Sequence, residues 1–149
     1  MTSVNFFVPG IPKPGGSKTA FRSKRGKMIV TDSCKGVKPW RAAVAQLARD
    51  NDVTMIPRGI PVSLLLVFTI PRPKGHYGTG KNANKLKPGA PPFPTGRPDV
   101  LKLARAVEDA LTGILWYDDA QIVKESLQKL YCVVATEMPG VYITAGSLA

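Results

Sequence analysis

An amphipathic helix is the feature that most constrains the fold of this chain. After Asp99, apolar residues recur three and four positions apart, which predicts a helix with one face toward a core. These residues are Val100, Leu103, Ala104, Val107 and Leu111. Asp99 stands where an N-cap belongs, and Gly113 where such a helix stops. The acidic pair Asp118-Asp119 follows, so we expect a core helix held between two carboxylate positions.

The remaining pattern predicts an α+β fold. A second helix is expected over 38–50, and residues 60–70 form the strongest strand, with apolar residues on both faces. That strand should be central and covered on both sides. Weaker strands are expected over 4–8, 120–127, 129–135 and 141–144, and a hairpin over 19–31. We therefore predict one domain over 1–149, with a mixed β-sheet and two principal helices.

Charge divides the chain into two unequal parts. Residues 1–98 carry 17 Lys/Arg and 3 acids, a net charge of +14, whereas residues 99–149 carry 4 and 7, a net charge of −3. The first part has the surface charge of a polyanion binder. Carboxylates concentrated beside such a surface are what metal-dependent phosphodiester chemistry needs, because the acids can hold a cation between themselves and the phosphate.

Two loops carry much of the positive charge. Residues 9–18 hold three prolines, three glycines and two lysines, Lys13 and Lys18, and read either as a mobile arm that wraps nucleic acid or as an ordinary solvated loop. Residues 71–98 hold seven prolines, six Lys/Arg and no acid, which fits a DNA-gripping element that orders on binding. Tyr77 and Phe93 either pack locally or stack there on an exposed base.

Several classes of function are disfavoured. The chain has one histidine, His76, so a histidine metal cage or a Ser-His-Asp triad would be hard to build. Cys34 and Cys132 lack metal-ligand spacing and read as reduced thiols. There is no long apolar run and no secretory pattern, so we expect a cytoplasmic protein that does not contact a membrane and uses no small-molecule cofactor.

Residues 98–122 resemble the signature of the RusA family of Holliday junction resolvases, common in phages and prophages. The matching segments are Pro98-Asp99, Lys102-Leu103, Arg105-Ala106-Val107, Asp109-Ala110-Leu111 and Asp118-Asp119-Ala120-Gln121-Ile122. The stretches GIPKPGGSK and FTIPRPKGHYG, and Lys129, are similar to the phage branch. The resemblance implies a Mg²⁺-dependent endodeoxyribonuclease, with Mn²⁺ as a substitute, that acts as a two-fold symmetric homodimer on four-way DNA in recombination and repair, in the bacterial host's cytoplasm.

The resemblance also implies site residues. Asp99 and Asp119 are the first expected metal ligands and catalytic residues, and Arg105 occupies the family's basic catalytic position. Asp118 is either a further ligand or a solvent-exposed acid of the turn. Asp109 lies too far along the helix to share an ion with Asp99 and should be an i+4 partner of Arg105 or a dimer contact. The expected DNA contacts are Lys102, Lys129, Arg72, Lys74, Arg97, Lys13 and Lys18.

One departure from the family pattern matters. The position two residues after Asp99, an aspartate in the family, is Leu101 here. Glu108 is the nearest spare carboxylate, but it lies seven residues further along the helix, so we do not expect it to substitute for the missing aspartate. Two alternatives to the enzyme therefore stay open. One is a catalytically impaired protein that binds branched or single-stranded DNA on the same fold, and the other is a basic RNA-binding protein, although no RNA motif is recognisable.

Overall fold

The computed structural model describes residues 3–16, 18–32, 34–134 and 136–148. Its strands are β1 (Ser3–Pro9), β2 (Lys18–Arg22), β3 (Met28–Asp32), β4 (Val62–Ile70), β5 (Ile122–Tyr131) and β6 (Gly140–Ser147). Its helices are α1 (Val37–Asp50) and α2 (Val100–Leu111), with short 3₁₀ turns η1 (Lys74–His76), η2 (Gly80–Asn82) and η3 (Asp119–Gln121). The predicted α+β class, with two principal helices, is confirmed.

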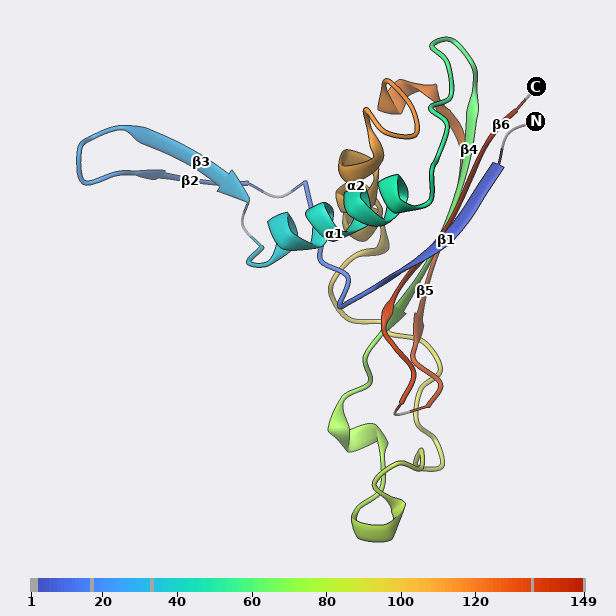
Figure 1. Cartoon of the computed structure of the whole chain (residues 1–149). Coiled ribbons are helices and arrows are strands. Elements are labelled where there is room, and N and C mark those ends of the chain that lie inside the picture. Colours follow the sequence, from blue (N-terminus) through green and yellow to red (C-terminus); the bar gives the residue numbers. More distant parts are fainter. Residues whose placement is uncertain (1–2, 17, 33, 135, 149) are drawn as a thin grey trace.

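A mixed sheet with the order β1-β6-β4-β5 forms the body of the molecule (Figure 1). The β1–β6 and β6–β4 pairs are antiparallel, and the β4–β5 pair is parallel. The connection from β4 to β5 contains α2, as a parallel pair requires a long crossover. Because β4 and β5 run the same way, α2 returns along the sheet from the end of β4 toward the start of β5.

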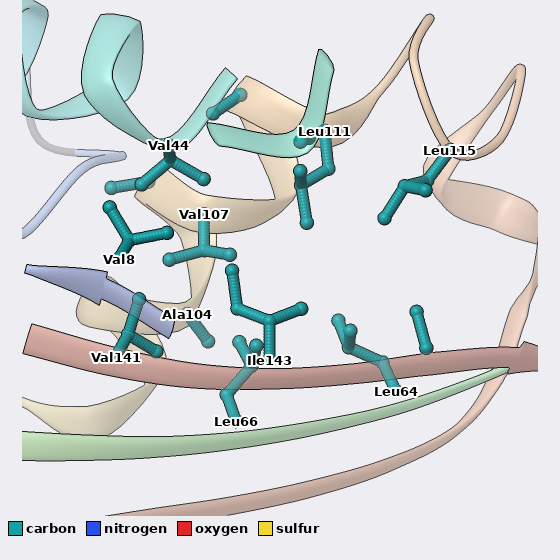
Figure 2. Close-up of a cluster of buried hydrophobic side chains, with 14 of the residues drawn as sticks. Val8, Val44, Leu64, Leu66, Ala104, Val107, Leu111, Leu115, Val141 and Ile143 are labelled. Carbon is teal, nitrogen blue, oxygen red and sulfur yellow. The ribbon is translucent and has the colours of Figure 1, made fainter. Parts of the chain in front are cut away.

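The core lies between the two helices and one face of the sheet. Ala104, Val107 and Leu111 of α2 point toward Leu66 and Ile143 of the sheet (Figure 2). Val44 of α1 and Val8 of β1 complete this side of the cluster. The predicted stripe is thus the buried one, and it is wider than expected because Ala106 and Ala110 are also buried.

The expectation that residues 60–70 are covered on both faces is wrong. The strand is central, between β6 and β5, and its Val62, Leu64 and Leu66 are buried. On the other face Leu65 is 41% exposed and Tyr142 of the neighbouring strand is also exposed, since both helices lie on the same side of the sheet (Figure 1). An apolar run alone cannot tell a strand covered on both faces from one that leaves apolar side chains in solvent.

Two other strand predictions need correction. The expected strands over 120–127 and 129–135 are one strand, β5, which ends at Tyr131. Ala135 lies outside the described residues. The predicted hairpin over 19–31 is confirmed as β2 and β3, which pair from Lys18–Asp32 to Arg22–Met28.

None of the helices in the part of the chain that the structure describes has the length and apolarity that a membrane crossing needs.

At Gly140, which begins β6, the packing leaves no room for a side chain. A Cβ at this position would collide with the carbonyl oxygen of Val8 and with the ring of Phe7 on the paired strand β1. We expect Gly140→Ala to lower the free energy of unfolding by about 2–3 kcal/mol, the effect of overpacking a rigid backbone contact. Urea denaturation measures this. Gly75→Ala is the control, since its Cβ would meet open space, and an equal loss in both variants would contradict the steric explanation.

Candidate active site

Asp99 begins helix α2 as its N-cap residue, as the sequence predicts. Its backbone is extended, at φ −68° and ψ 140°, but its side chain makes no capping hydrogen bond. The residue is exposed. The Asp99 carboxylate is therefore not occupied in capping the helix and faces solvent, where it could receive a cation or a phosphate-bound water.

Lys129 fixes the segment that leads into Asp99. Its ammonium donates to the carbonyl oxygens of Gly96, at 2.6 Å, and Pro98, at 2.9 Å. The sequence predicted a DNA contact for this lysine. In the structure its charge is engaged with the backbone on either side of Arg97, so its evident role is to place the start of α2 against the edge of β5.

Asp119 is held at the other end of α2. One of its oxygens, Oδ1, accepts a hydrogen bond from Trp116 Nε1 at 3.1 Å and a short one from the Thr112 hydroxyl. Trp116 is fully buried, and Thr112 is the C-cap of α2. A rigid indole and the helix end therefore orient this carboxylate. Sequence reasoning identified Asp119 but missed both residues that position it.

Asp118 acts as a cap in the structure. Its carboxylate accepts from the Ala120 N–H at 2.9 Å, while Gln121 Oε1 accepts from the Asp118 N–H at 3.2 Å, which completes a capping box around η3. Gln121 Nε2 also donates to the Pro57 carbonyl at 2.8 Å and so ties this turn to the loop before β4. The acidic pair thus divides into one capping residue, Asp118, and one carboxylate, Asp119, that Thr112 and Trp116 orient.

Asp99 and Asp119 are not brought together within one chain. Thr112, which contacts Asp119, is 13 positions after Asp99, an axial rise of about 20 Å along a helix. The distance along β5 between the residue that holds the Asp99 end and the start of the strand near Asp119 is similar. Lys129, which holds Pro98, pairs with Phe68, whereas β5 starts seven residues earlier at Ile122 opposite Val62, about 23 Å away at the rise of a strand.

A divalent cation site built from Asp99, Asp118 and Asp119 therefore does not fit a single chain. Mg²⁺ binds its oxygen ligands at about 2.0–2.1 Å, far less than the separation of the two helix ends. Among the described residues, no group of three or more His, Cys, Asp or Glu side chains is arranged to hold a metal ion. Asp119, beyond the far end of α2, is like Asp109 too distant from Asp99 to share an ion with it in the same chain.

An acidic pair that the sequence did not indicate lies at the Asp119 end of the helix. Burial, the hydrogen bond to Glu125 and the negative charges of Glu125 and Asp119 raise the pKa of Glu108 to about 8, while Arg105 acts in the opposite direction. Glu108 comes from α2 and Glu125 from β5, so the pair joins helix and sheet edge. The two residues are 17 positions apart in the sequence, and the packing of α2 on β5 brings them together. Glu108 is remote from Leu101, as its place in the sequence suggests.

Leu101 is exposed to solvent, and Asp109 contacts the other helix, α1. Leu101 is 70% exposed on the first turn of α2, so its side chain contributes little to the core. Asp109 lies 3.8 Å from Arg41 of α1, and that guanidinium also binds Asp32 at 2.6 Å. The predicted Asp109–Arg105 pair does not form. This leaves Arg105 exposed and without a salt bridge in the described part of the chain.

The predicted DNA contacts divide into engaged and exposed groups. Arg72 donates to the carbonyl oxygens of Cys132, at 2.8 Å, and Pro91, at 2.7 Å, so it pins the long loop to the end of β5. Lys18 pairs with Asp32 at 2.5 Å, and Lys13 is half-buried against Gly36. Of the predicted contacts, Lys74, Arg97 and Lys102 are exposed and form no salt bridge with a described residue, and the same holds for the catalytic candidate Arg105.

The two basic loops are more structured than expected. Residues 71–98 contain η1, η2 and an antiparallel bridge between Tyr77 and Leu86, so this loop does not need DNA in order to acquire structure. Phe93 is exposed there, whereas Tyr77 is half-buried. In the other loop, Gly15 donates its N–H to the Lys102 carbonyl at 2.8 Å and is buried against Ala106. The predicted mobile arm is thus partly anchored on α2.

Comparison with known proteins gives two findings. A family model described as endodeoxyribonuclease RusA matches residues 9–145, nearly the whole chain. An uncharacterized protein of Bacillus subtilis (strain 168), YqaN, is 31% identical over 135 residues, which are 88% of this chain and 89% of that protein. The family match reaches from the end of β1 into β6 and includes every candidate site residue described above.

Proposed function

The chain belongs to the RusA endodeoxyribonuclease family, and from this premise we propose that it is a structure-specific nuclease that resolves four-way DNA junctions by paired nicks. The observation that carries the proposal is the family match over residues 9–145 together with exposed Asp99 and oriented Asp119 at the two ends of one helix. The exposed cations next to Asp99 support a polyanionic substrate.

Arg105 is the best candidate for a group that binds the scissile phosphate. It lies on the solvent side of α2, about one and a half turns after Asp99, and has no salt bridge among the described residues. A guanidinium can grip two phosphate oxygens and stabilise the charge that develops in the transition state. Lys102 and Arg97 flank Asp99 and would hold neighbouring phosphates. Lys129 would act indirectly, by keeping the start of α2 in place.

Dependence on Mg²⁺, with Mn²⁺ as a substitute, is part of the proposal. When bound, such an ion would supply a nucleophilic water and neutralise phosphate charge. One chain does not bring Asp99 and Asp119 together, so we propose a two-fold homodimer in which Asp99 of one copy faces Asp119 of the other. Such a dimer would also present two equivalent sites to the two equivalent strands of a four-way junction.

A second candidate function is junction binding without cleavage. Leu101 is the observation that favours it, because an exposed leucine replaces a family carboxylate on the first turn of α2, two residues after Asp99. Such a protein would keep the fold and the basic surface and would bind branched DNA in recombination or repair without hydrolysing it. The exposure of Leu101 also means that an aspartate could be introduced there without disturbing the core.

Cleavage of a synthetic four-way junction in Mg²⁺ and in Mn²⁺ tests the two candidates. We expect paired nicks from the natural protein and cleavage about a hundredfold slower by Asp99→Asn, since even groups that only support a metal ligand contribute about 10- to 100-fold. Leu101→Asp should cleave at a lower metal concentration, because it adds a carboxylate near Asp99. Asp52→Asn, an exposed acid just after α1, is the control. If the natural protein binds the junction without cutting it, and Leu101→Asp cuts it, the natural protein is a junction-binding protein that has lost nuclease activity.

A further inference from the structure

The β2–β3 hairpin stands apart from the body of the protein. Its strands form a two-stranded sheet of their own, separate from the four-stranded sheet. In Figure 1 this hairpin projects well away from the helices and the main sheet. Every residue of β2 is exposed. A two-stranded hairpin is marginally stable alone in water, so an exposed one of this kind is expected to work against a partner surface.

Apolar side chains are displayed near the end of the hairpin. Val30, Met28 and Phe21 are 64%, 58% and 48% exposed. The register places Phe21 opposite Ile29 and Met28 opposite Arg22, in the two cross-strand pairs next to the turn. Side chains alternate along a strand, so Met28 and Val30 share one face and Phe21 lies on the other. The hairpin therefore carries apolar groups on both faces of a thin ribbon.

Charge identifies the partner. The turn and its flanks, residues 22–27, contain Arg22, Lys24, Arg25 and Lys27 and no acid. The hairpin's single acid, Asp32, is at its base and is paired with Lys18 and Arg41. DNA phosphates would attract such a tip. Cations next to apolar side chains are also the combination that proteins insert between base steps.

The base of the hairpin is tied to the candidate site. Arg41 of α1 binds Asp32, at the end of β3, at 2.6 Å and reaches Asp109 of α2 at 3.8 Å. The segment before β2 is anchored to the same helix by the Gly15 N–H, which donates to the Lys102 carbonyl at 2.8 Å. Both ends of the hairpin are therefore connected to the helix that carries Asp99 and Arg105, so DNA held by the hairpin would be held in a defined position relative to that helix.

We propose that the β2–β3 hairpin is the element that distinguishes branched DNA from duplex DNA. Its cationic tip binds phosphates, and Phe21, Met28 and Val30 contact the faces of bases that are unstacked at a branch point. In continuous duplex these faces are covered by neighbouring bases, so the apolar contacts form only on the branched substrate. The inference rests on the proposed function, since it names the structural feature of DNA that the protein reads.

The test compares binding to a four-way junction and to a duplex at matched salt by fluorescence anisotropy. The variant Phe21→Thr/Met28→Gln/Val30→Thr keeps strand-forming or similarly shaped residues while it removes apolar surface. We expect it to bind the junction about tenfold more weakly and the duplex equally well, since the variant loses only the contacts with exposed base faces. The control, Val123→Thr on β5, removes an equally exposed valine (63%) and should change neither affinity.

A charge variant separates the two parts of the hairpin. Lys24→Gln/Arg25→Gln should weaken junction and duplex binding together and lower the slope of log affinity against log salt by about 0.9 for each phosphate that the variant no longer neutralises. Unchanged junction preference in the apolar variant would overturn the inference. A change in its mass by light scattering would also overturn it, since the hairpin would then be a subunit contact. A natural protein that binds no DNA would overturn the proposed function as well.

Discussion

A mixed dimer of one Asp99→Asn chain and one Asp119→Asn chain should cut a four-way junction, although each variant alone should be inactive. In a dimer whose sites combine Asp99 of one copy with Asp119 of the other, each pure variant has two damaged sites. In the mixed dimer, both substitutions fall in one site and leave the second intact. The pure variants should lose more than about a hundredfold in rate, because even groups that only support a metal ligand contribute about 10- to 100-fold.

The products should differ as well as the rate. One intact site per dimer can cut one strand, so the mixed dimer should release nicked junctions where the natural protein makes paired nicks. Two differently tagged chains, co-expressed and purified through both tags, give the required species. Sequencing gels of strand-labelled junctions then separate single from paired cleavage. The matched control is a mixed dimer of Asp99→Asn with natural chain, which should also retain one intact site.

Inactivity of the double-tagged mixed dimer would contradict the shared site. In that case both carboxylates would be needed within one chain, and α2 would have to be rebuilt, because its two ends lie about 20 Å apart. Equal activity of the mixed dimer and the natural protein, with paired nicks, would contradict a role for either carboxylate. The shared site is inferred from the positions of the two carboxylates. Asp99 begins α2, and Thr112 and Trp116 orient Asp119 at the C-terminal end of the same helix.

The local sequence pattern correctly predicts the elements whose formation depends on a few consecutive residues. The apolar spacing after Asp99 correctly predicts the buried face of α2, and the two short strand-like runs within 19–31 correctly predict a hairpin. Trp40, on the apolar stripe of the helix predicted over 38–50, is a core residue and 5% exposed. These properties follow from side-chain period and turn chemistry, which are written in consecutive residues. The α2 contact surface is broader than its stripe predicts because α1 and Gly15 also pack on this helix.

Long-range partners could not be predicted from spacing. Spacing pairs Asp109 with Arg105 on its own helix, but Asp109 lies against Arg41, 68 positions earlier in the chain. Lys129 and Arg72 have the charge of DNA contacts, yet both donate to backbone carbonyls that only the folded loop brings near. In sequence Glu108 stands out only as the spare carboxylate nearest to Leu101, whereas its partner is Glu125 on the strand that follows the crossover. In each case tertiary packing engages a side chain whose partner the spacing does not indicate.

The Glu108–Glu125 pair should make the protein less stable as pH rises. Burial, followed by the hydrogen bond and charge of Glu125, raises the pKa of Glu108 from 4.5 to about 8. The folded chain therefore keeps a proton that the unfolded chain releases between about pH 4.5 and 8. Unfolding releases this proton, so the free energy of unfolding decreases with increasing pH across this window, by up to about 1.4 kcal/mol per pH unit for one full proton. Below pH 4.5 and above pH 8 the dependence from this pair should vanish.

Glu108→Gln should remove most of that slope, because glutamine mimics the protonated acid and cannot ionise. Urea denaturation at pH 5, 6.5 and 8, with a chelator present, measures it. The variant should gain stability relative to the natural protein as pH approaches 8, where Glu108, Glu125 and Asp119 would otherwise repel one another and Arg105 alone opposes them. Asp52→Asn, a substitution on the exposed surface, should keep the natural slope. If Glu108→Gln kept the slope of the natural protein, the retained proton would belong to another group and the pair would not be coupled as its geometry indicates.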